Sequence, residues 1–164
     1  MSYFVHPHRF PKNVDGPFYT LGTLYPPSDD PILTPGWHGN CMACEAPEGE
    51  APDLLAPLTN GGNVDTYFVR QPETPDEVNR AVRAAKICCT SALRYGGQDR
   101  EIIKALGNNP EFCDYVYDQH GVLHLTIDSN GNPYPFAQEM FAKGRAFLLV
   151  RRQSTARPWW KFWA

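Results

Sequence analysis

The feature that most constrains this chain is a pair of cysteines, Cys41 and Cys44, within the sequence GNCMACEAPEGEAPDLLA. At this spacing both thiols can point from one tight loop into a single coordination sphere, and soft thiolates suit zinc or the iron of iron-sulfur clusters. Three residues after Cys44 stands Pro47, where such loops usually supply a third thiolate. The segment therefore predicts either a metal site with an unusual ligand set or the remnant of one.

Three further cysteines, Cys88, Cys89 and Cys113, bring the total to five. The number is odd and the sequence MSYFVHPHRFPKN has no basic and apolar leader, so a disulfide framework is the poorer explanation. Free cysteine is among the most buried residue types, and we expect Cys113 to pack in the core. Metal ligation, redox chemistry or burial remain for the others.

The composition is that of one loop-rich globular domain. The chain has 164 residues, and its 16 prolines and 13 glycines predict many turns and few long helices. The longest apolar run, in RAFLLVRR, is far shorter than the roughly 20 residues that cross a bilayer. We therefore expect a cytoplasmic protein without a transmembrane segment.

Charge is unevenly distributed along the chain. All 18 acidic residues but only 11 of the 15 basic ones fall within residues 1–150, which gives that part a net charge of −7. Phosphate recognition requires a basic face, so this acidic body argues against binding of nucleic acid. It favours docking on a basic protein surface.

Hydrophobic periodicity and turn residues predict short elements of both kinds. We expect strands in 17–21, 65–72 and 92–97, a Pro-rich loop over 25–40, a helical turn in 51–56, helices over 75–88, 99–107 and 137–152, and a hairpin over 121–136. The turn of that hairpin is assigned to Asn130 and Gly131, and Val122 to the core. His6 and His8 are expected to be exposed.

The clearest helix signal is TPDEVNRAVRAAKICC. Thr74 is placed as the N-cap, Pro75 occupies the first helical position, and Glu77 follows Thr74 by three residues, as a capping box requires. The helix is expected to end near Cys88.

A strand, the cysteine loop, the sequence EAPDLLA, a second strand, a capped helix and then CCTSALRYGG follow one another in this chain. In this order the segment from Gly16 to Gly97 resembles a single-cluster bacterial-type ferredoxin. In that family three cysteines of one loop and a remote cysteine, usually followed by proline, hold the cluster. The resemblance implies a ferredoxin-like fold and electron transfer.

Carried across position by position, the resemblance makes Cys41 and Cys44 the first two ligands and Cys88 the remote one. Pro47 stands at the third ligand position, and Cys89 replaces the proline that normally follows the remote cysteine. Both departures fall at the metal site, whereas the surrounding elements keep the family order.

Four hypotheses for the site stay open. An iron-sulfur cluster would use Cys41, Cys44 and Cys88, either as a three-iron cluster or as a four-iron cluster completed by Cys89, a carboxylate or an exogenous ligand. Zinc would use the same three thiols with Cys89 or His38. A redox dithiol would use Cys41 and Cys44. Finally, the thiols of a clusterless relative would merely be buried.

Two segments are candidates for binding a protein partner. The acidic cluster Glu45, Glu48, Glu50 and Asp53 would face a redox partner, since complementary charge raises encounter rates. The ending RPWWKFWA is expected to dock on a partner, on the protein itself or, less favoured, on a membrane surface. The aromatic residues assigned to this docking are Trp159, Trp160, Phe162 and Trp163.

The sequence thus predicts an α+β fold with a small antiparallel sheet and short helices. It comprises an N-terminal arm (1–15), a ferredoxin-like domain (16–97), a C-terminal α-β-hairpin-α extension (98–152) and an aromatic-basic tail (153–164). The expected function is a small iron-sulfur electron-transfer protein that is not itself an enzyme. The alternative is a clusterless interaction or accessory protein, or a zinc-binding module.

Overall fold

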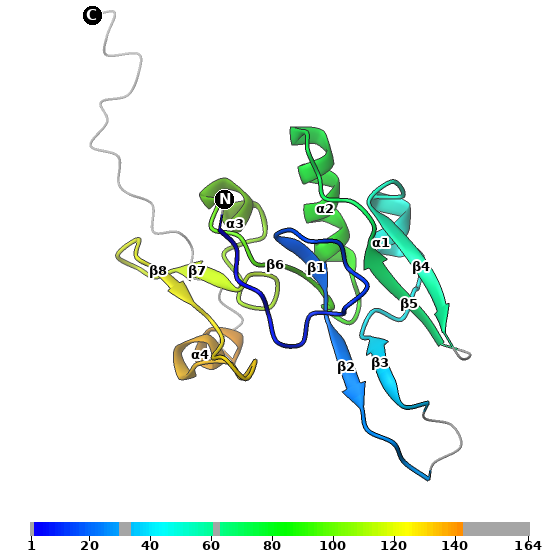
Figure 1. Cartoon of the computed structure of the whole chain (residues 1–164). Coiled ribbons are helices and arrows are strands. Elements are labelled where there is room, and N and C mark those ends of the chain that lie inside the picture. Colours follow the sequence, from blue (N-terminus) through cyan, green and yellow to red (C-terminus); the bar gives the residue numbers. More distant parts are fainter. Residues whose placement is uncertain (1, 30–33, 61–62, 143–164) are drawn as a thin grey trace, which may run out of the picture.

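The computed structural model describes residues 2–29, 34–60 and 63–142, which form a mixed α+β protein (Figure 1). The predicted class, with small antiparallel sheets and short helices, is confirmed. In chain order the elements are β1 (Phe18–Thr20), β2 (Gly22–Tyr25), β3 (Gly36–Gly39), α1 (Ala46–Glu50), β4 (Leu55–Asn60), β5 (Asn63–Phe68), α2 (Pro75–Ile87), β6 (Leu93–Tyr95), α3 (Arg100–Ala105), β7 (Tyr115–Tyr117), β8 (Leu123–Leu125) and α4 (Pro135–Ala142). No helix in the described ranges is long and apolar enough to cross a membrane.

Strand pairing joins segments that are far apart in the sequence. β1 pairs antiparallel with β6, so that Phe18 lies opposite Tyr95. β4 and β5 form a hairpin, β5 contacts β1, and α1 packs against α2 (Figure 1). One hydrophobic core runs beneath these elements and also takes in Ile103, Leu106 and Val116 from the C-terminal part.

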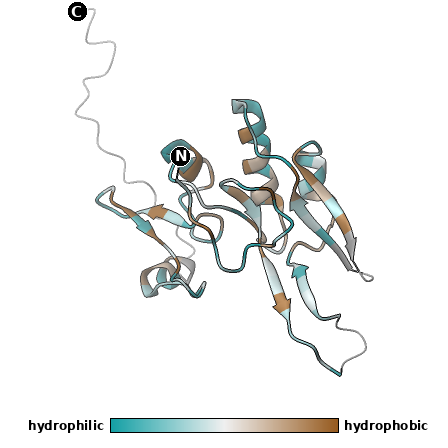
Figure 2. Cartoon of the chain, viewed as in Figure 1, coloured by the Kyte–Doolittle hydropathy of each residue, from teal (hydrophilic) through white to brown (hydrophobic). Residues whose placement is uncertain are grey.

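Helix α2 forms as the sequence predicts. The side chain of Thr74 accepts the N–H of Glu77 at 3.2 Å, and Glu77 Oε2 accepts the N–H of Thr74 at 3.0 Å, which completes the capping box. Hydrophobic and hydrophilic residues alternate along this helix (Figure 2), and Ala81, Val82, Ala84 and Ala85 face the core. The helix ends with Cys88 as its C-cap, which delivers two cysteines to the end of α2.

Strands β2 and β3 form an antiparallel ribbon (Figure 1), and β3 lies within the segment 25–40 that the sequence predicts to be a Pro-rich loop. Thr23 lies opposite His38 and Leu24 opposite Trp37. The strand sequences GTLY and GWHG both begin with glycine, a residue that is depleted in strands. Neither sequence therefore shows the alternation of apolar and polar residues that predicts a strand. A side chain at Gly39 would come within 2.9 Å of Asp65 Cβ, so the close approach of β3 to β5 requires glycine at this position.

The short helix expected in 51–56 is displaced toward the N-terminus. Helix α1 spans Ala46–Glu50, and Leu55 already begins β4. The proline at position 47 favours a helix start, because its fixed φ suits the first turn. The sequence EAPEGE, rather than APDLLA, is therefore the helical segment.

In the C-terminal part, α3 begins as predicted after Asp99, whose Oδ1 accepts the N–H groups of Glu101 and Ile102. The hairpin, however, joins β7 to β8 and turns over 118–122. Asn130 and Gly131, predicted to form the hairpin turn, lie in a loop whose ends are joined by a single β-bridge between Ile127 and Pro133. Because the hairpin is displaced, Val122 lies in the turn and is 51% exposed, so its assignment to the core is wrong.

Cys113 is fully buried, as predicted. Helix α4 covers only the first part of the helix expected over 137–152, and residues 143–152 lie outside the described residues.

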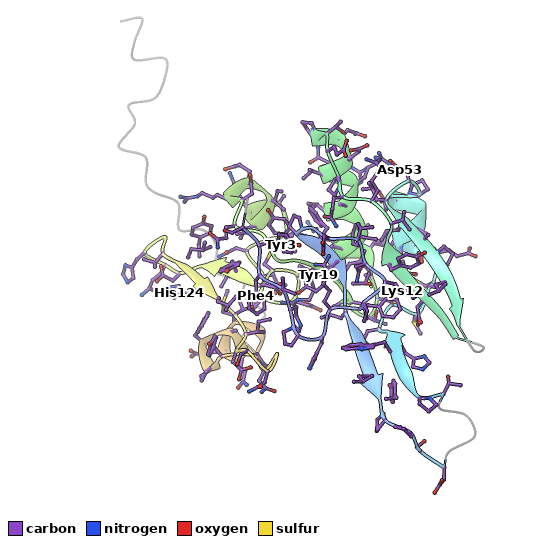
Figure 3. The ribbon with its side chains drawn as sticks, in the orientation of Figure 1. Tyr3, Phe4, Lys12, Tyr19, Asp53 and His124 are labelled. Carbon is purple, nitrogen blue, oxygen red and sulfur yellow. The ribbon has the colours of Figure 1, made fainter. Side chains whose placement is uncertain are left out.

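A buried polar cluster, here named the Arg94–Asp114 centre, consists of Tyr19, Arg94 and Asp114. The Tyr19 hydroxyl donates to Asp114 Oδ2 at 2.6 Å, and Arg94 Nε donates to Asp114 Oδ1 at 2.9 Å. The remaining Arg94 N–H groups donate to the carbonyl oxygens of residues 110, 111 and 113. The cluster fixes β1 and β6 to the segment before β7, and its Tyr19 lies near the middle of the described residues (Figure 3).

Candidate thiol centre

Four of the five cysteines lie where the loop after β3 meets the C-terminal end of α2. We name Cys41, Cys44, Cys88 and Cys89 the thiol centre. The Sγ atoms of Cys44 and Cys89 are 3.9 Å apart, and the thiols of Cys41 and Cys88 interact with each other. The structure therefore brings together all four cysteines that the sequence analysis selected.

Backbone geometry explains how the first loop turns. Ala43 and Glu45 have φ angles of 48° and 66°, in the left-handed region that few non-glycine residues adopt. These two residues turn the chain between Cys41 and the start of α1. Pro47 is buried in α1, so the position at which the resemblance requires a third thiolate is part of a helix instead.

Leu21 links the two cysteine loops through its backbone. Its carbonyl oxygen accepts the N–H of Asn40 at 2.9 Å, beside Cys41, and its N–H donates to the carbonyl of Ala92 at 2.8 Å, beyond Cys89. Ser91, with φ 52°, donates its N–H to the Cys88 carbonyl and closes the second loop. Both loops are thereby held to the end of β1.

Cys41 and Cys88 form an inner pair, with exposures of 1% and 5%. Their mutual hydrogen bond, with burial, raises the pKa of Cys41, and the same hydrogen bond lowers the pKa of Cys88 to about 5. Thr90 Oγ1 lies 3.4 Å from Cys88 Sγ. Cys88 is therefore the more acidic thiol of the inner pair.

Cys44 and Cys89 form an outer, exposed pair. The contact with Cys44, together with desolvation, raises the pKa of Cys89. The sulfur of Met42, a residue that is 64% exposed, lies 3.5 Å from Cys89 Sγ. The outer pair is thus exposed beside the sulfur of a methionine.

Sequence reasoning missed two neighbouring residues of β5: Thr66, which lies beside Cys41, and Asp65, which lies beside Gly39. Thr66 is buried, hydrogen-bonds the thiol of Cys41 and donates to Glu48 Oε1. Asp65 is 2% exposed, and burial raises its pKa. Among the described side chains, Glu48 Oε2 and Asp65 Oδ2 are buried without a hydrogen-bond partner. The unusual signal was an aspartate inside a strand, where this residue type is depleted.

Two of the four residues in the predicted acidic docking surface are paired with arginines. Asp53 accepts hydrogen bonds from Arg70, at 2.7 Å, and from Arg80, and it lies between α1 and α2 (Figure 3). Glu50 accepts from Arg83 at 2.7 Å. These ion pairs give the surface both signs of charge, so a uniformly acidic face does not form.

The donor chemistry of the thiol centre fits a thiolate-held iron-sulfur group. Its four sulfurs are soft ligands gathered from two loops that strands and helices hold in place. Within the described ranges, no three His, Cys, Asp or Glu side chains converge on a position for one metal ion. His38, the histidine considered for zinc, has its Nε2 2.8 Å from the carbonyl oxygen of Thr34.

Other predicted residues lie elsewhere. His6 is 5% exposed, contrary to expectation, and its Nδ1 accepts the N–H of His8 at 2.9 Å. Trp159, Trp160, Phe162 and Trp163 lie outside the described residues, so docking by the tail stays a prediction.

Comparison with family models, with curated proteins and with solved structures gives no match to this chain.

Proposed function

We propose that this protein is a small ferredoxin-like electron-transfer protein whose thiol centre holds an iron-sulfur cluster, with Cys41, Cys44 and Cys88 among the ligands. The observation that carries the proposal is the meeting of thiols from two loops that are far apart in the sequence. A bound cluster of this kind would supply reversible electron transfer.

The order of elements also supports the proposal. Strand β1, the cysteine loop, α1, the β4–β5 hairpin, α2 and β6 follow one another, and the first and last strands pair. The resemblance to single-cluster ferredoxins rests on this order with one strand before the cysteine loop and one strand before α2. The structure adds β4, and it adds the β2–β3 ribbon between β1 and Cys41.

The chain's own residues provide burial on one side of the centre and access on the other. Cys41 and Cys88 belong to the hydrophobic core, which excludes water from the inner pair. Cys44, Cys89 and Met42 are exposed, so a partner can approach the sulfurs directly. We propose that this rim, together with the mixed charges around Asp53, contacts a protein redox partner.

The test is the iron and acid-labile sulfide content of untagged protein purified without oxygen, together with its visible spectrum. Iron with matching sulfide and broad thiolate-to-iron absorbance are expected. Cys88→Ser should bleach the protein, whereas Cys113→Ala, which alters a buried cysteine outside the centre, should not. Well-folded wild-type protein that is free of iron after reconstitution would refute the proposal.

A clusterless accessory protein is the second candidate, and the outer pair favours it. Two exposed thiols 3.9 Å apart can close to a disulfide of about 2.05 Å, giving up two protons and two electrons to an external oxidant. This candidate predicts colourless, metal-free protein in which Cys44 and Cys89 cycle between dithiol and disulfide.

A further inference from the structure

The four thiols of the centre are arranged as two pairs, and each pair takes one cysteine from each loop. The inner pair is Cys41 with Cys88, and the outer pair is Cys44 with Cys89. We infer that the site is built for a two-iron, two-sulfide cluster, with one pair of thiolates on each iron and Cys89 as the fourth ligand. This inference rests on the proposed function and specifies its cluster.

The separation of the outer sulfurs supports this assignment. In tetrahedral sites with metal–thiolate bonds of about 2.3 Å, two sulfurs on one ion lie about 3.8 Å apart. Cys44 Sγ and Cys89 Sγ are 3.9 Å apart, so they already have the separation of two ligands on one metal atom. The inner thiols, Cys41 and Cys88, are both buried in the same hydrophobic core, apart from the exposed outer pair.

The adjacent cysteines support the same arrangement. The Cα atoms of neighbouring residues are about 3.8 Å apart, and two vicinal thiols rarely reach one small ion without strain. Here Cys88 is buried and Cys89 is exposed, so their side chains point in different directions and join different pairs. Vicinal cysteines that bind two neighbouring irons avoid the strain.

Pro47 is also accounted for. A cluster built on the family pattern needs a thiolate at this position, and the structure places a buried proline there, at the start of α1. A two-iron cluster needs four thiolates, and the centre supplies four without Pro47. The two departures from the ferredoxin pattern, Pro47 and Cys89, then compensate for each other.

The experiment is anaerobic reconstitution of the full chain with iron and sulfide, read out by metal and sulfide analysis and by Mössbauer and electron paramagnetic resonance spectra. We expect two irons and two sulfides per chain, and one unpaired electron per cluster after reduction by dithionite. Cys89→Ala should lose at least half of the iron, while Cys113→Ala keeps all of it. Circular dichroism would show that both variants are folded.

The outcomes separate this inference from the proposed function. Three or four irons per chain, unchanged in Cys89→Ala, would overturn the two-iron assignment and keep the iron-sulfur function. Folded protein that binds no iron, or that binds one zinc without sulfide, would overturn both.

Discussion

The Arg94–Asp114 centre and the thiol centre are both clusters of titratable groups next to the β1–β6 pair. They differ in how completely those groups are buried and hydrogen-bonded. In the first, both oxygens of Asp114 accept hydrogen bonds from side chains, and Arg94 also donates to three carbonyls. In the second, two of the four thiols are exposed, and Glu48, which is hydrogen-bonded to Thr66 beside Cys41, retains an unpartnered oxygen.

The difference separates a structural cluster from a candidate site. Buried polar groups that are all satisfied hold neighbouring elements in one arrangement. Thiols that contact mainly one another, with one side open to solvent, remain available to a metal or an oxidant. Burial alone therefore does not distinguish the candidate site. What distinguishes it is that its thiols can still bind a metal or react with an oxidant.

The largest expected contrast between the two centres is in thiol reactivity. In reduced, metal-free protein we expect Cys44 to react with a maleimide at the rate of an exposed thiol, and Cys89, which is also exposed but has a raised pKa, to react more slowly. Cys113, beside the Arg94–Asp114 centre, should react at least about a thousandfold more slowly, because an opening that costs about 4 kcal/mol must come first. Time-resolved labelling with peptide mass spectrometry measures each rate. Similar labelling rates for Cys44 and Cys113 would contradict the predicted difference in exposure between the two centres.

Removing Asp114 should break the closed centre. Asp114→Ala leaves the buried Arg94 guanidinium unpaired, and we expect a loss of about 3–5 kcal/mol in the free energy of unfolding. Urea denaturation measures it. Tyr19→Phe, which removes one hydrogen bond from the same carboxylate, should cost about 1 kcal/mol. If Asp114→Ala cost no more than Tyr19→Phe, the ion pair would not be holding the centre together.

These two centres also show what the sequence could predict. The helix over Pro75–Ile87 and the strands around Phe18 and Leu93 were predictable, because capping and alternation are local signals. The gathering of Cys41, Cys44 and Cys88 was expected from the resemblance, and Cys89 was one of the alternatives for a fourth ligand. The pairing of Arg94 with Asp114 depends on contacts 20 residues apart, which no local pattern encodes.

The displaced elements have a common physical cause. The turn at 128–132 carries strong turn residues, yet the longer strand pairing forms around 118–122, where Tyr115 meets Leu125. Likewise, the glycines in β2 and β3 are typical of loops rather than strands, so the ribbon was not predicted. In β5, the only local signal for the buried Asp65 was the presence of an aspartate among strand-forming residues. Tertiary packing decided these positions.

Acid should lower the free energy of unfolding through His6, a buried histidine near Arg94. Burial, then the charge of Arg94, lowers the pKa of His6 to about 3, whereas the unfolded chain has a pKa near its usual value of about 6.5. The unfolded state therefore binds a proton first as the pH falls. Stability should decrease between about pH 6.5 and 3, by at most about 1.4 kcal/mol per pH unit from this group.

His6→Gln isolates this contribution, because glutamine does not titrate and can still accept the N–H of His8. The difference in unfolding free energy between wild type and His6→Gln, measured at several pH values, should change steadily below pH 6.5. A constant difference would show that His6 takes up its proton at the same pH in both states.

The smallest expected effect lies at the end of α2 opposite the thiol centre. Thr74→Ala removes the side-chain cap of Glu77 N–H, and we expect a loss of about 1 kcal/mol, whereas Thr74→Ser keeps the cap. The thiols lie beyond the other end of the helix, at its C-cap. Labelling rates of Cys44 and Cys89 should therefore stay the same while urea denaturation shows the loss. If the rates rose with Thr74→Ala but not with Thr74→Ser, the openness of the centre would depend on the whole helix rather than on its two loops.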